Sequence, residues 1–357
     1  MAEVVEGHGG EPVEGHGGEP VEGHGGEPVE EHGGEVVRGH AVEFVKGHGT
    51  ENDFVLLPDP DGTLVLTAEQ VRAICDRHRG IGADGVLRVV RTAKSLEPDV
   101  EPLADEAEWF MDYRNADGSL SEMCGNGVRV FIRFLLDEGW ASGSSIPVAT
   151  RGGVRRARVE PDSTIAVDMG APVARRGGLT EVRIGETSWA ATALDIPNPH
   201  AVVVVDDLAE AGALLAAAEA RPGDPYPGVH IPGRLFPDGV NVEFVRIDEP
   251  GHLAMRVFER GVGETRSCGT GACAAVVAAR DRLGAGAPEQ WQVSVPGGVL
   301  RVTQRGEPGS ARRERPEHAG EAGWFEFSTE RDLGDSVELA GPAVLVARGS
   351  LDLDALG

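Results

Sequence analysis

Short apolar runs of strand length, separated by turn residues, follow one another along the chain from residue 41 onward. In the first half such runs occupy residues 55–58, 85–90 and 165–167, which is the pattern of buried β-strands. Two longer stretches, residues 69–77 and 128–138, instead repeat apolar side chains at helical spacing. The first half is therefore predicted to be β-rich, with amphipathic helices between its strands.

The second half of the chain repeats this plan. Apolar runs recur around residues 201–205, 240–245 and 252–258, and a helix is predicted from about residue 270 to 283. An apolar run near the C-terminus, residues 343–349, predicts a closing strand. Two halves built alike indicate two related lobes.

The length of the chain also favours two folded parts. With 357 residues, of which 40% are hydrophobic, the chain exceeds the size of about 250–300 residues at which single cores stop growing. We expect an N-terminal lobe over residues 43–168, completed by a closing strand over 342–353, and a C-terminal lobe over 169–341. Within the second lobe, the polar, Pro- and Gly-rich residues 305–323 predict a surface loop.

The N-terminal segment, residues 1–42, differs from the rest. It is a tandem octapeptide of the form EPVEGHGG, rich in Glu and Gly and without aromatic residues. Such a composition cannot bury a hydrophobic core, so we expect a disordered tail whose removal leaves activity intact. Its histidines recur every eight residues, which leaves weak metal binding open, although the Gly-Gly spacing offers no preorganised ligand geometry.

The charge balance and the cysteine count limit the classes of function. The formal net charge is -26, which argues against nucleic acid and anionic membranes as partners. No stretch approaches the roughly 20 apolar residues of a membrane span, and the N-terminus lacks a signal-peptide pattern. Four cysteines are too few for a disulfide scaffold in a chain of this size. These features predict a soluble, cytoplasmic protein with free thiols.

Two of the four cysteines open nearly identical segments. Cys124 begins CGNG before one predicted helix and Cys268 begins CGTG before the other, whereas Cys75 and Cys273 are expected to be structural. A cysteine at a helix N-terminus lies beside unpaired amide N–H groups and the positive end of the helix dipole, which stabilise a thiolate. The glycines let the same amides approach a carboxylate. Each segment therefore predicts a reactive thiol beside a carboxylate-binding site.

Two such segments in related lobes suit one reaction in particular. A substrate held by its α-carboxylate between them would present opposite faces of its α-carbon to Cys124 and Cys268. One thiolate could remove the α-proton while the other thiol protonates the opposite face. Helix N-termini aimed at the carboxylate would stabilise the negative charge that develops. The pattern predicts a two-base epimerase, and the sequence contains no evident pyridoxal lysine motif or metal-ligand cluster.

Several motifs together resemble the diaminopimelate epimerase family, over a span from about Phe44 to Leu353. They are the segments Asn52-Asp53-Phe54, 76–85 (DRHRGIGADG), 113–119 (YRNADGS), 123–127 (MCGNG), 198–200 (NPH), 240–242 (VNV) and 259–265 (ERGVGET) before Cys268. The resemblance implies an α/β (α+β) fold of two pseudo-symmetric lobes, each a β-barrel-like sheet around a central helix, with the last strand returning to the first lobe. It also implies cofactor-independent interconversion of LL- and meso-diaminopimelate, for lysine and peptidoglycan synthesis, by a cytoplasmic homodimer.

The resemblance further implies roles for individual residues. Cys124 and Cys268 would be the acid/base pair. The reacting carboxylate would be held by the amides of Gly125, Asn126, Gly269 and Thr270. The other substrate contacts would come from Asn52, Asn115, Asn198, Asn241, Glu259 and Arg260. Of these, the amide side chains and the guanidinium would bind the end that is not inverted. His200 and Glu259 are expected to tune the pKa of the two thiols.

Departures from the family and competing functions remain. Gly85 stands where many relatives have a Gln that contacts substrate, and Thr50-Glu51 replaces the commoner residues before Asn52. A proline racemase or hydroxyproline epimerase of the same superfamily would use the same thiols, but Glu259 and Arg260, with the asparagines, favour a long dicarboxylate. A metal-binding protein that works through its His-rich tail and a thiol oxidoreductase are more distant alternatives.

Overall fold

A computed structural model shows the fold of the protein. It describes residues 41–214, 228–231, 233–237, 239–260, 262–306, 331–333 and 335–356. The expectations for the repeat tail therefore lie outside the described residues, except for residues 41 and 42, which belong to a strand. Most of the expected surface loop, residues 307–323, also lies outside them. Everything described below belongs to one unit of the chain, Gly39–Gly357.

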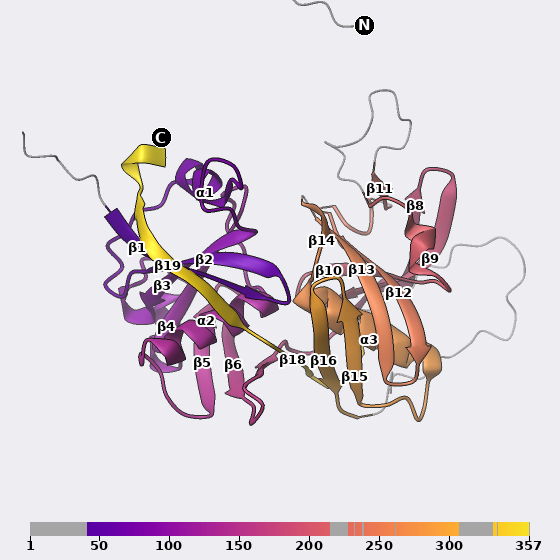
Figure 1. The fold of residues 1–357 in the computed structure, drawn as a ribbon. Coiled ribbons are helices and arrows are strands. Elements are labelled where there is room, and N and C mark those ends of the chain that lie inside the picture. The colour runs from indigo at the N-terminus through magenta and orange to yellow at the C-terminus, as the bar shows by residue number, and fades with distance from the viewer. Residues whose placement is uncertain are drawn as a thin grey trace, which may run out of the picture. The chain divides into compact units, whose positions relative to one another are not determined.

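The first lobe is a sheet curved around one helix (Figure 1). Its strands are β1 (Ala41–Gly49), β2 (Asn52–Pro58), β3 (Gly85–Arg91), β4 (Trp109–Asn115), β5 (Ser145–Thr150), β6 (Gly153–Val159), β7 (Ile165–Asp168) and β19 (Val344–Asp352). The helix α2 (Gly125–Asp137) contacts almost all of these strands, so it lies inside the sheet. A short helix, α1 (Ala68–Cys75), begins at a capping box formed by Thr67 and Gln70 and packs on β3.

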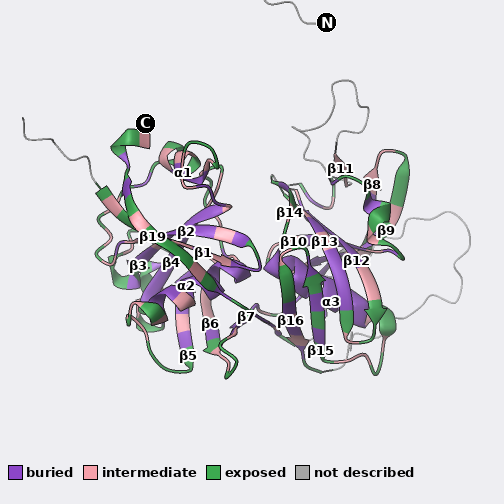
Figure 2. Cartoon of the chain, in the orientation of Figure 1, coloured by how far each residue is buried: buried purple, intermediate pink, exposed green. Residues whose placement is uncertain are grey.

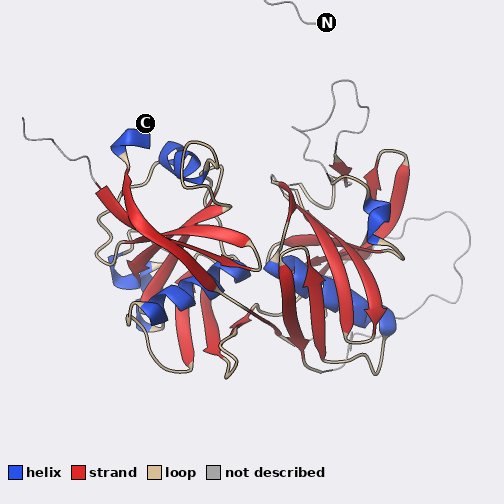
Figure 3. Cartoon of the chain, in the orientation of Figure 1, coloured by secondary structure: helices blue, strands red, loops and turns tan. Residues whose placement is uncertain are grey.

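The second lobe has the same construction around the helix α3 (Gly269–Leu283), and Figure 3 shows the helix of each lobe among its strands. Its strands are β8 (Val173–Ile184), β9 (Thr187–Asp195), β10 (Pro199–Val204), β11 (Val229–His230), β12 (Asn241–Glu249), β13 (His252–Glu259), β14 (Gly263–Thr265), β15 (Gln290–Val295), β16 (Gly298–Gln304), β17 (Arg331–Asp332) and β18 (Val337–Gly341). Short 3-10 turns occupy Thr92–Lys94, Glu101–Asp105, Leu208–Ala211 and Asp354–Leu356. Within the described part of the chain, no helix is long and apolar enough to cross a bilayer.

The strand pairings of the two lobes follow one order. From β2 to β7, successive pairs are parallel, antiparallel, parallel, antiparallel and antiparallel. The strands β10, β12, β13, β15, β16 and β18 repeat that order pair by pair. The helices α2 and α3 stand at the same place in the two series. The predicted α/β class with two related halves is confirmed.

The registers of the parallel pairs define equivalent positions in the two lobes. Phe54 of β2 lies opposite Gly85 at the start of β3. His200 of β10 lies opposite Asn241 at the start of β12. Phe54 therefore corresponds to His200, and Gly85 corresponds to Asn241.

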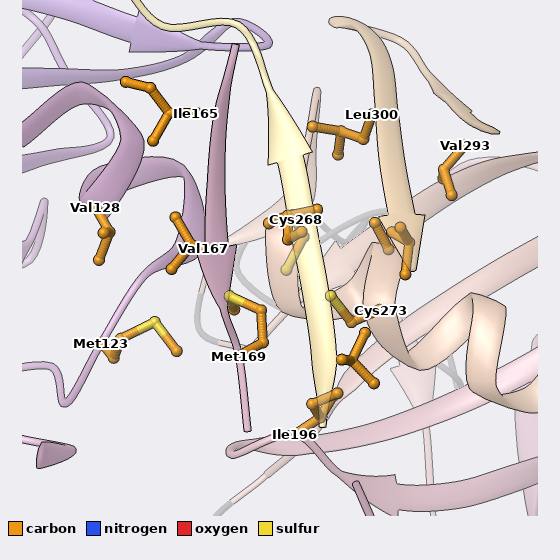
Figure 4. Packing of buried hydrophobic residues seen from close by; sticks show 14 of the residues in the cluster. Met123, Val128, Ile165, Val167, Met169, Ile196, Cys268, Cys273, Val293 and Leu300 are labelled. Carbon is orange, nitrogen blue, oxygen red and sulfur yellow. The ribbon is translucent and has the colours of Figure 1, made fainter. Parts of the chain in front are cut away.

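The lobes are joined at one pair of strands and by a common core. The strands β7 and β18 pair antiparallel, and the chain then returns to the first lobe, where β19 pairs antiparallel with β1. The apolar run near the C-terminus lies largely within β19. One buried hydrophobic cluster includes side chains of both central helices. Figure 2 shows that most of each central helix is buried. Figure 4 shows part of this cluster, in which Ile165 and Val167 of β7 and the adjacent Met169 belong to the same core as Cys268.

Candidate active site

Cys124 and Cys268 are the N-cap residues of the two central helices. The amide of Gly127 donates to Sγ of Cys124 at 3.4 Å, and the amide of Gly271 donates to Sγ of Cys268 at 3.4 Å. The prediction that a helix begins directly after each cysteine is confirmed. Each sulfur thus occupies the place of an N-cap oxygen, where it accepts one of the unpaired amides of the first helical turn.

The starts of the two helices touch across the lobe boundary. A Cβ on Gly269 would lie 3.2 Å from Oδ1 of Asn126 and 2.8 Å from Cδ2 of Leu339, so no larger residue fits there without movement. Nδ2 of Asn126 donates to the carbonyl of Ser267 at 3.2 Å. The hydroxyls of Thr50 and Ser267 are 2.7 Å apart. These contacts connect the two cysteine segments directly.

A buried arginine supports this junction. The guanidinium of Arg129, on α2, contacts Oδ1 of Asn126 and donates to the carbonyl of Pro342 at 2.7 Å. Burial lowers the pKa of Arg129 to about 10. No role could be assigned to Arg129 from the sequence, because its partner Pro342 lies far away in the chain.

A pocket of about 590 Å³ lies where the helix starts meet. All the residues predicted to be catalytic or to contact substrate line it: Asn52, Asn115, Cys124, Gly125, Asn126, Asn198, Asn241, Glu259, Arg260, Cys268, Gly269 and Thr270. His200 is not among its lining residues. The lining also includes Asp84, Tyr113 and Thr265, to which the sequence analysis gave no role, although all three lie in or next to its motifs.

The side chain of Asn52 connects the first cysteine to the junction. Its Nδ2 donates to Oδ2 of Asp84 at 2.8 Å, and its Oδ1 accepts from Nδ2 of Asn126 at 3.0 Å. The thiol of Cys124 lies 3.7 Å from the same Oδ1. Burial raises the pKa of Asp84, and the neighbouring Asp53 raises it further. Asp84 therefore fixes which end of the Asn52 amide faces the thiol.

Two other asparagines of the pocket are also held by protein groups. Oδ1 of Asn241 accepts the backbone N–H of Arg260 at 2.9 Å. Oδ1 of Asn198 lies 2.9 Å from Nε2 of His200. Because these oxygens face the protein, the amide NH2 groups are left as donors for a ligand in the pocket.

His200 lies behind the pocket, fully buried against a carboxyl group. Its Nδ1 is 2.7 Å from Oε1 of Glu243, which is also 0% exposed. Since Nε2 faces Asn198, both ring nitrogens have a partner other than a thiol. The predicted tuning of the thiols by His200 stays a prediction, and it would have to act through space. Glu243 was not singled out by the sequence analysis, because a single Glu in an apolar strand carries no motif.

Burial dominates the ionisation of both thiols. It raises the pKa of Cys124 to about 11, although the amide of Gly127 lowers it. It raises the pKa of Cys268 well above the usual value, and the charges of Glu259 and Glu243 add to this. The helix N-terminus therefore acts in the predicted direction on each thiol, but burial acts against it and outweighs the amides in the protein alone.

Glu259 is a buried carboxyl group of the pocket whose pKa lies near neutral pH. Burial raises its pKa to about 7, against a hydrogen bond from the hydroxyl of Thr265 that lowers it. The charges of Asp84 and Glu243 also contribute to the raised pKa, and the charge of His200 acts against it. A carboxyl group poised near neutrality beside two thiols can accept or release a proton at working pH.

The departure at Gly85 has a steric basis. A Cβ at this position would lie 2.7 Å from the carbonyl oxygen of Arg114 and 2.7 Å from Cε2 of Tyr113. Its equivalent in the second lobe, Asn241, lines the pocket. The pocket therefore receives a side-chain amide from this pair of positions in one lobe and not in the other.

Comparison with known proteins identifies the family. The family model described as diaminopimelate epimerase matches residues 44–174 and 192–313. The chain belongs to the diaminopimelate epimerase family. A diaminopimelate epimerase of Streptomyces coelicolor is 46% identical over 85% of this chain and 93% of its own length. One of Thermobifida fusca is 46% identical over 86% of this chain and 97% of its own length. The predicted enzyme class, an isomerase, is confirmed.

Solved structures of low sequence identity share the fold of this family member. A hydroxyproline epimerase from Agrobacterium vitis superposes with a TM-score of 0.57 at 14% identity, over 88% of this chain and 93% of its own. A phenazine biosynthesis protein of the PhzF family from Bacillus anthracis gives a TM-score of 0.52 at 16% identity, over 87% of this chain and 99% of its own. At these identities the likeness concerns the fold alone.

Proposed function

We propose that this chain interconverts LL- and meso-diaminopimelate by two-base proton transfer between Cys124 and Cys268. The observation that carries the proposal is that two thiols, at equivalent helix N-termini of duplicated lobes, line one pocket. A reaction that uses one cysteine would require only one of these two thiols. Two bases on opposite sides of one α-carbon are what inversion requires.

The helix starts supply the site for the reacting carboxylate. The backbone amides of Gly125 and Asn126 open one helix, and those of Gly269 and Thr270 open the other, all beside the pocket. Unpaired amides and the positive ends of two helix dipoles favour an anion there. The same groups stabilise the charge that develops on the carboxylate when the α-proton leaves.

The two thiols and Glu259 must hold their protons in a particular arrangement for the reaction to begin. One thiol must be a thiolate when the other carries its proton, and burial opposes that state in the protein alone. The ammonium group of a bound amino acid brings a positive charge beside the thiols, which favours the thiolate. Glu259, with a pKa of about 7, is a suitable acceptor for the displaced proton.

The remaining residues favour a substrate that carries a second amino-acid group. The donors of Asn198 and Asn241 line the pocket together with Glu259 and Arg260, so the lining offers partners for both a carboxylate and an ammonium group. Both relatives reported above are named diaminopimelate epimerase. We place the activity in lysine and peptidoglycan precursor synthesis on the same basis. The cytoplasmic location and the homodimer are further proposals, the second testable by light scattering.

The test is to incubate the full chain with LL-diaminopimelate in deuterated water under reductant. NMR then follows the isomer composition and the α-deuterium content. We expect conversion to the meso form with deuterium at one α-carbon. Exchange with proline or hydroxyproline, and none with diaminopimelate, would replace the substrate but keep the mechanism. Absence of exchange with all three would overturn the proposal.

A further inference from the structure

Each lobe has two neighbouring buried positions that correspond to two positions in the other lobe, and the side chains at these positions differ between the lobes. In the parallel pairs of strands, Phe54 and Leu87 of the first lobe correspond to His200 and Glu243 of the second. All four side chains are 0% exposed. The first lobe thus has two apolar side chains where the second has an imidazole and a carboxyl group in contact.

Leu87 in the first lobe and Glu243 in the second lobe each pack against the first turn of the central helix of their lobe. A Cβ on Gly127 of α2 would lie 3.4 Å from Cδ2 of Leu87. A Cβ on Gly271 of α3 would lie 2.6 Å from Oε1 of Glu243. The carboxyl group therefore lies directly under the turn whose amide binds the sulfur of Cys268.

Stability does not explain the polar pair. Oε2 of Glu243 is buried and has no hydrogen-bond partner within the described part of the chain. A buried carboxyl group with an unsatisfied oxygen costs free energy, and apolar residues of similar volume generally do as well as a buried ion pair or better. The first lobe shows that the fold accepts an apolar pair at these positions.

The hydrogen bonds of His200 indicate what the pair does. Nδ1 faces the carboxyl oxygen Oε1 of Glu243 at 2.7 Å, and Nε2 faces the amide oxygen of Asn198 at 2.9 Å. A ring between two acceptors must donate from both nitrogens, which makes it an imidazolium. The charge of Glu243 balances the imidazolium in a place that water does not reach.

We infer that Glu243 is a positioning residue for substrate recognition: it holds His200 as an imidazolium, whose Nε2–H binds the amide oxygen of Asn198 and turns the amide NH2 towards the pocket. There the NH2 donates to a carboxylate oxygen at the distal end of the substrate. The inference deepens the proposed function and rests on it for the identity of the substrate. It assigns Glu243 no contact with the substrate and no part in the proton transfer.

The inference predicts what a neutral ring would do. A neutral imidazole that donates Nδ1–H to residue 243 has a lone pair on Nε2. Nε2 then accepts from the amide NH2 of Asn198, and the amide oxygen turns to the pocket instead. An oxygen beside a substrate carboxylate repels it, so the loss falls on binding.

The decisive variant is Glu243→Gln, which keeps the shape and removes the charge. With diaminopimelate as the substrate, we expect KM to rise by about tenfold, equivalent to about 1.4 kcal/mol, and kcat to change much less. Glu249→Gln is the matched control, because Glu249 forms an exposed pair with Nδ1 of His252 at 2.9 Å. We expect the control to leave both constants unchanged.

A second readout does not depend on activity. Nitrogen-15 NMR of labelled histidine distinguishes a ring protonated at both nitrogens from a neutral ring, with the His200 signal assigned by its loss in His200→Phe. We expect two protonated nitrogens in the parent and one in Glu243→Gln. A neutral His200 in the parent, or an unchanged KM in Glu243→Gln, would overturn the inference.

The paired exchange His200→Phe with Glu243→Leu installs the apolar pair of the first lobe. We expect this variant to fold, with a Tm no lower than that of the parent, and to show the rise in KM. If the parent did not act on diaminopimelate, the proposed function would fail while the NMR result still decided the state of His200. The two failures are therefore distinguishable.

Discussion

At the scale of single residues, the central problem is how a buried thiol becomes a base. Burial and, to a smaller degree, the charge of Glu259 raise the pKa of Cys124 to about 11. Dry surroundings penalise the thiolate but also strengthen each interaction that a bound substrate makes with it. The site is therefore suited to form its thiolate with the substrate in place.

The two-base assignment predicts a specific phenotype for Cys124→Ala and Cys268→Ala. Each should lower the rate of inversion by about 100-fold or more, because one face of the α-carbon loses its acid or base. The remaining thiol can still exchange the α-proton of the epimer that faces it, without inversion. Deuterium incorporation, followed separately for the LL and meso forms, measures this.

The control for the cysteine variants is Cys75→Ala, which removes a thiol buried in a separate hydrophobic cluster. It should invert the substrate at the parental rate. Full inversion by either Cys124→Ala or Cys268→Ala would contradict the two-base mechanism.

The charge of Glu259 predicts a pH effect on the thiols. Because this carboxylate raises the pKa of both Cys124 and Cys268, Glu259→Gln should lower them. The alkylation rate of the thiols by iodoacetamide, measured against pH without substrate, should then rise about one pH unit earlier than in the parent. Glu249→Gln, an exposed charge change, should leave the profile in place. An unchanged profile in Glu259→Gln would show that its charge does not reach the sulfurs.

At the scale of secondary-structure elements, local sequence predicted the helix starts well and the helix partners poorly. The CGNG and CGTG segments identify the N-termini of α2 and α3, because capping and glycine preferences are local. The roles of Arg129 and Glu243 could not be predicted, since their partners come from Pro342 and His200, far away in the sequence. Motifs therefore located the pocket lining, and only the structure located what supports it.

The contact between the two helix starts predicts that Gly269→Ala is damaging. Its Cβ would meet Leu339 at 2.8 Å and Asn126 at 3.2 Å. Overpacking of this kind costs about 1–3 kcal/mol, and it would push the two thiols apart. We expect a lower Tm and an inversion rate at least about tenfold lower, because small displacements at a reacting centre are costly.

Gly233→Ala provides the matched control for Gly269→Ala, because a Cβ there would meet nothing within 4 Å. Its Tm and activity should stay at the parental values. A Gly269→Ala variant as active as Gly233→Ala would mean that the lobes move apart without consequence for the thiols.

At the scale of the whole molecule, duplication explains both what the sequence analysis recovered and what it missed. Two similar Cys-Gly segments indicated two lobes, and the strand pairings repeat in the same order. The return of the last strand to the first lobe could be stated only as an implication of the family resemblance. Pairing between strands at opposite ends of the chain leaves no local pattern in the sequence. In the structure, β1 at one end of the described chain pairs with β19 at the other.

This closure predicts how far the N-terminus can be shortened. Removal of residues 1–40 leaves β1 complete, whereas removal of residues 1–49 deletes a strand that pairs with both β2 and β19. The first truncation should keep kcat/KM within about twofold and leave Tm unchanged, because every described strand and every described residue that lines the pocket lies after residue 40. The second should not fold, since the first lobe would lose its link to the C-terminal strand. Zinc uptake by equilibrium dialysis on the full and shortened chains tests the metal-binding alternative separately. Loss of activity on removal of residues 1–40, with Tm unchanged, would show that the octapeptide repeats take part in catalysis and would contradict their interpretation as a dispensable tail.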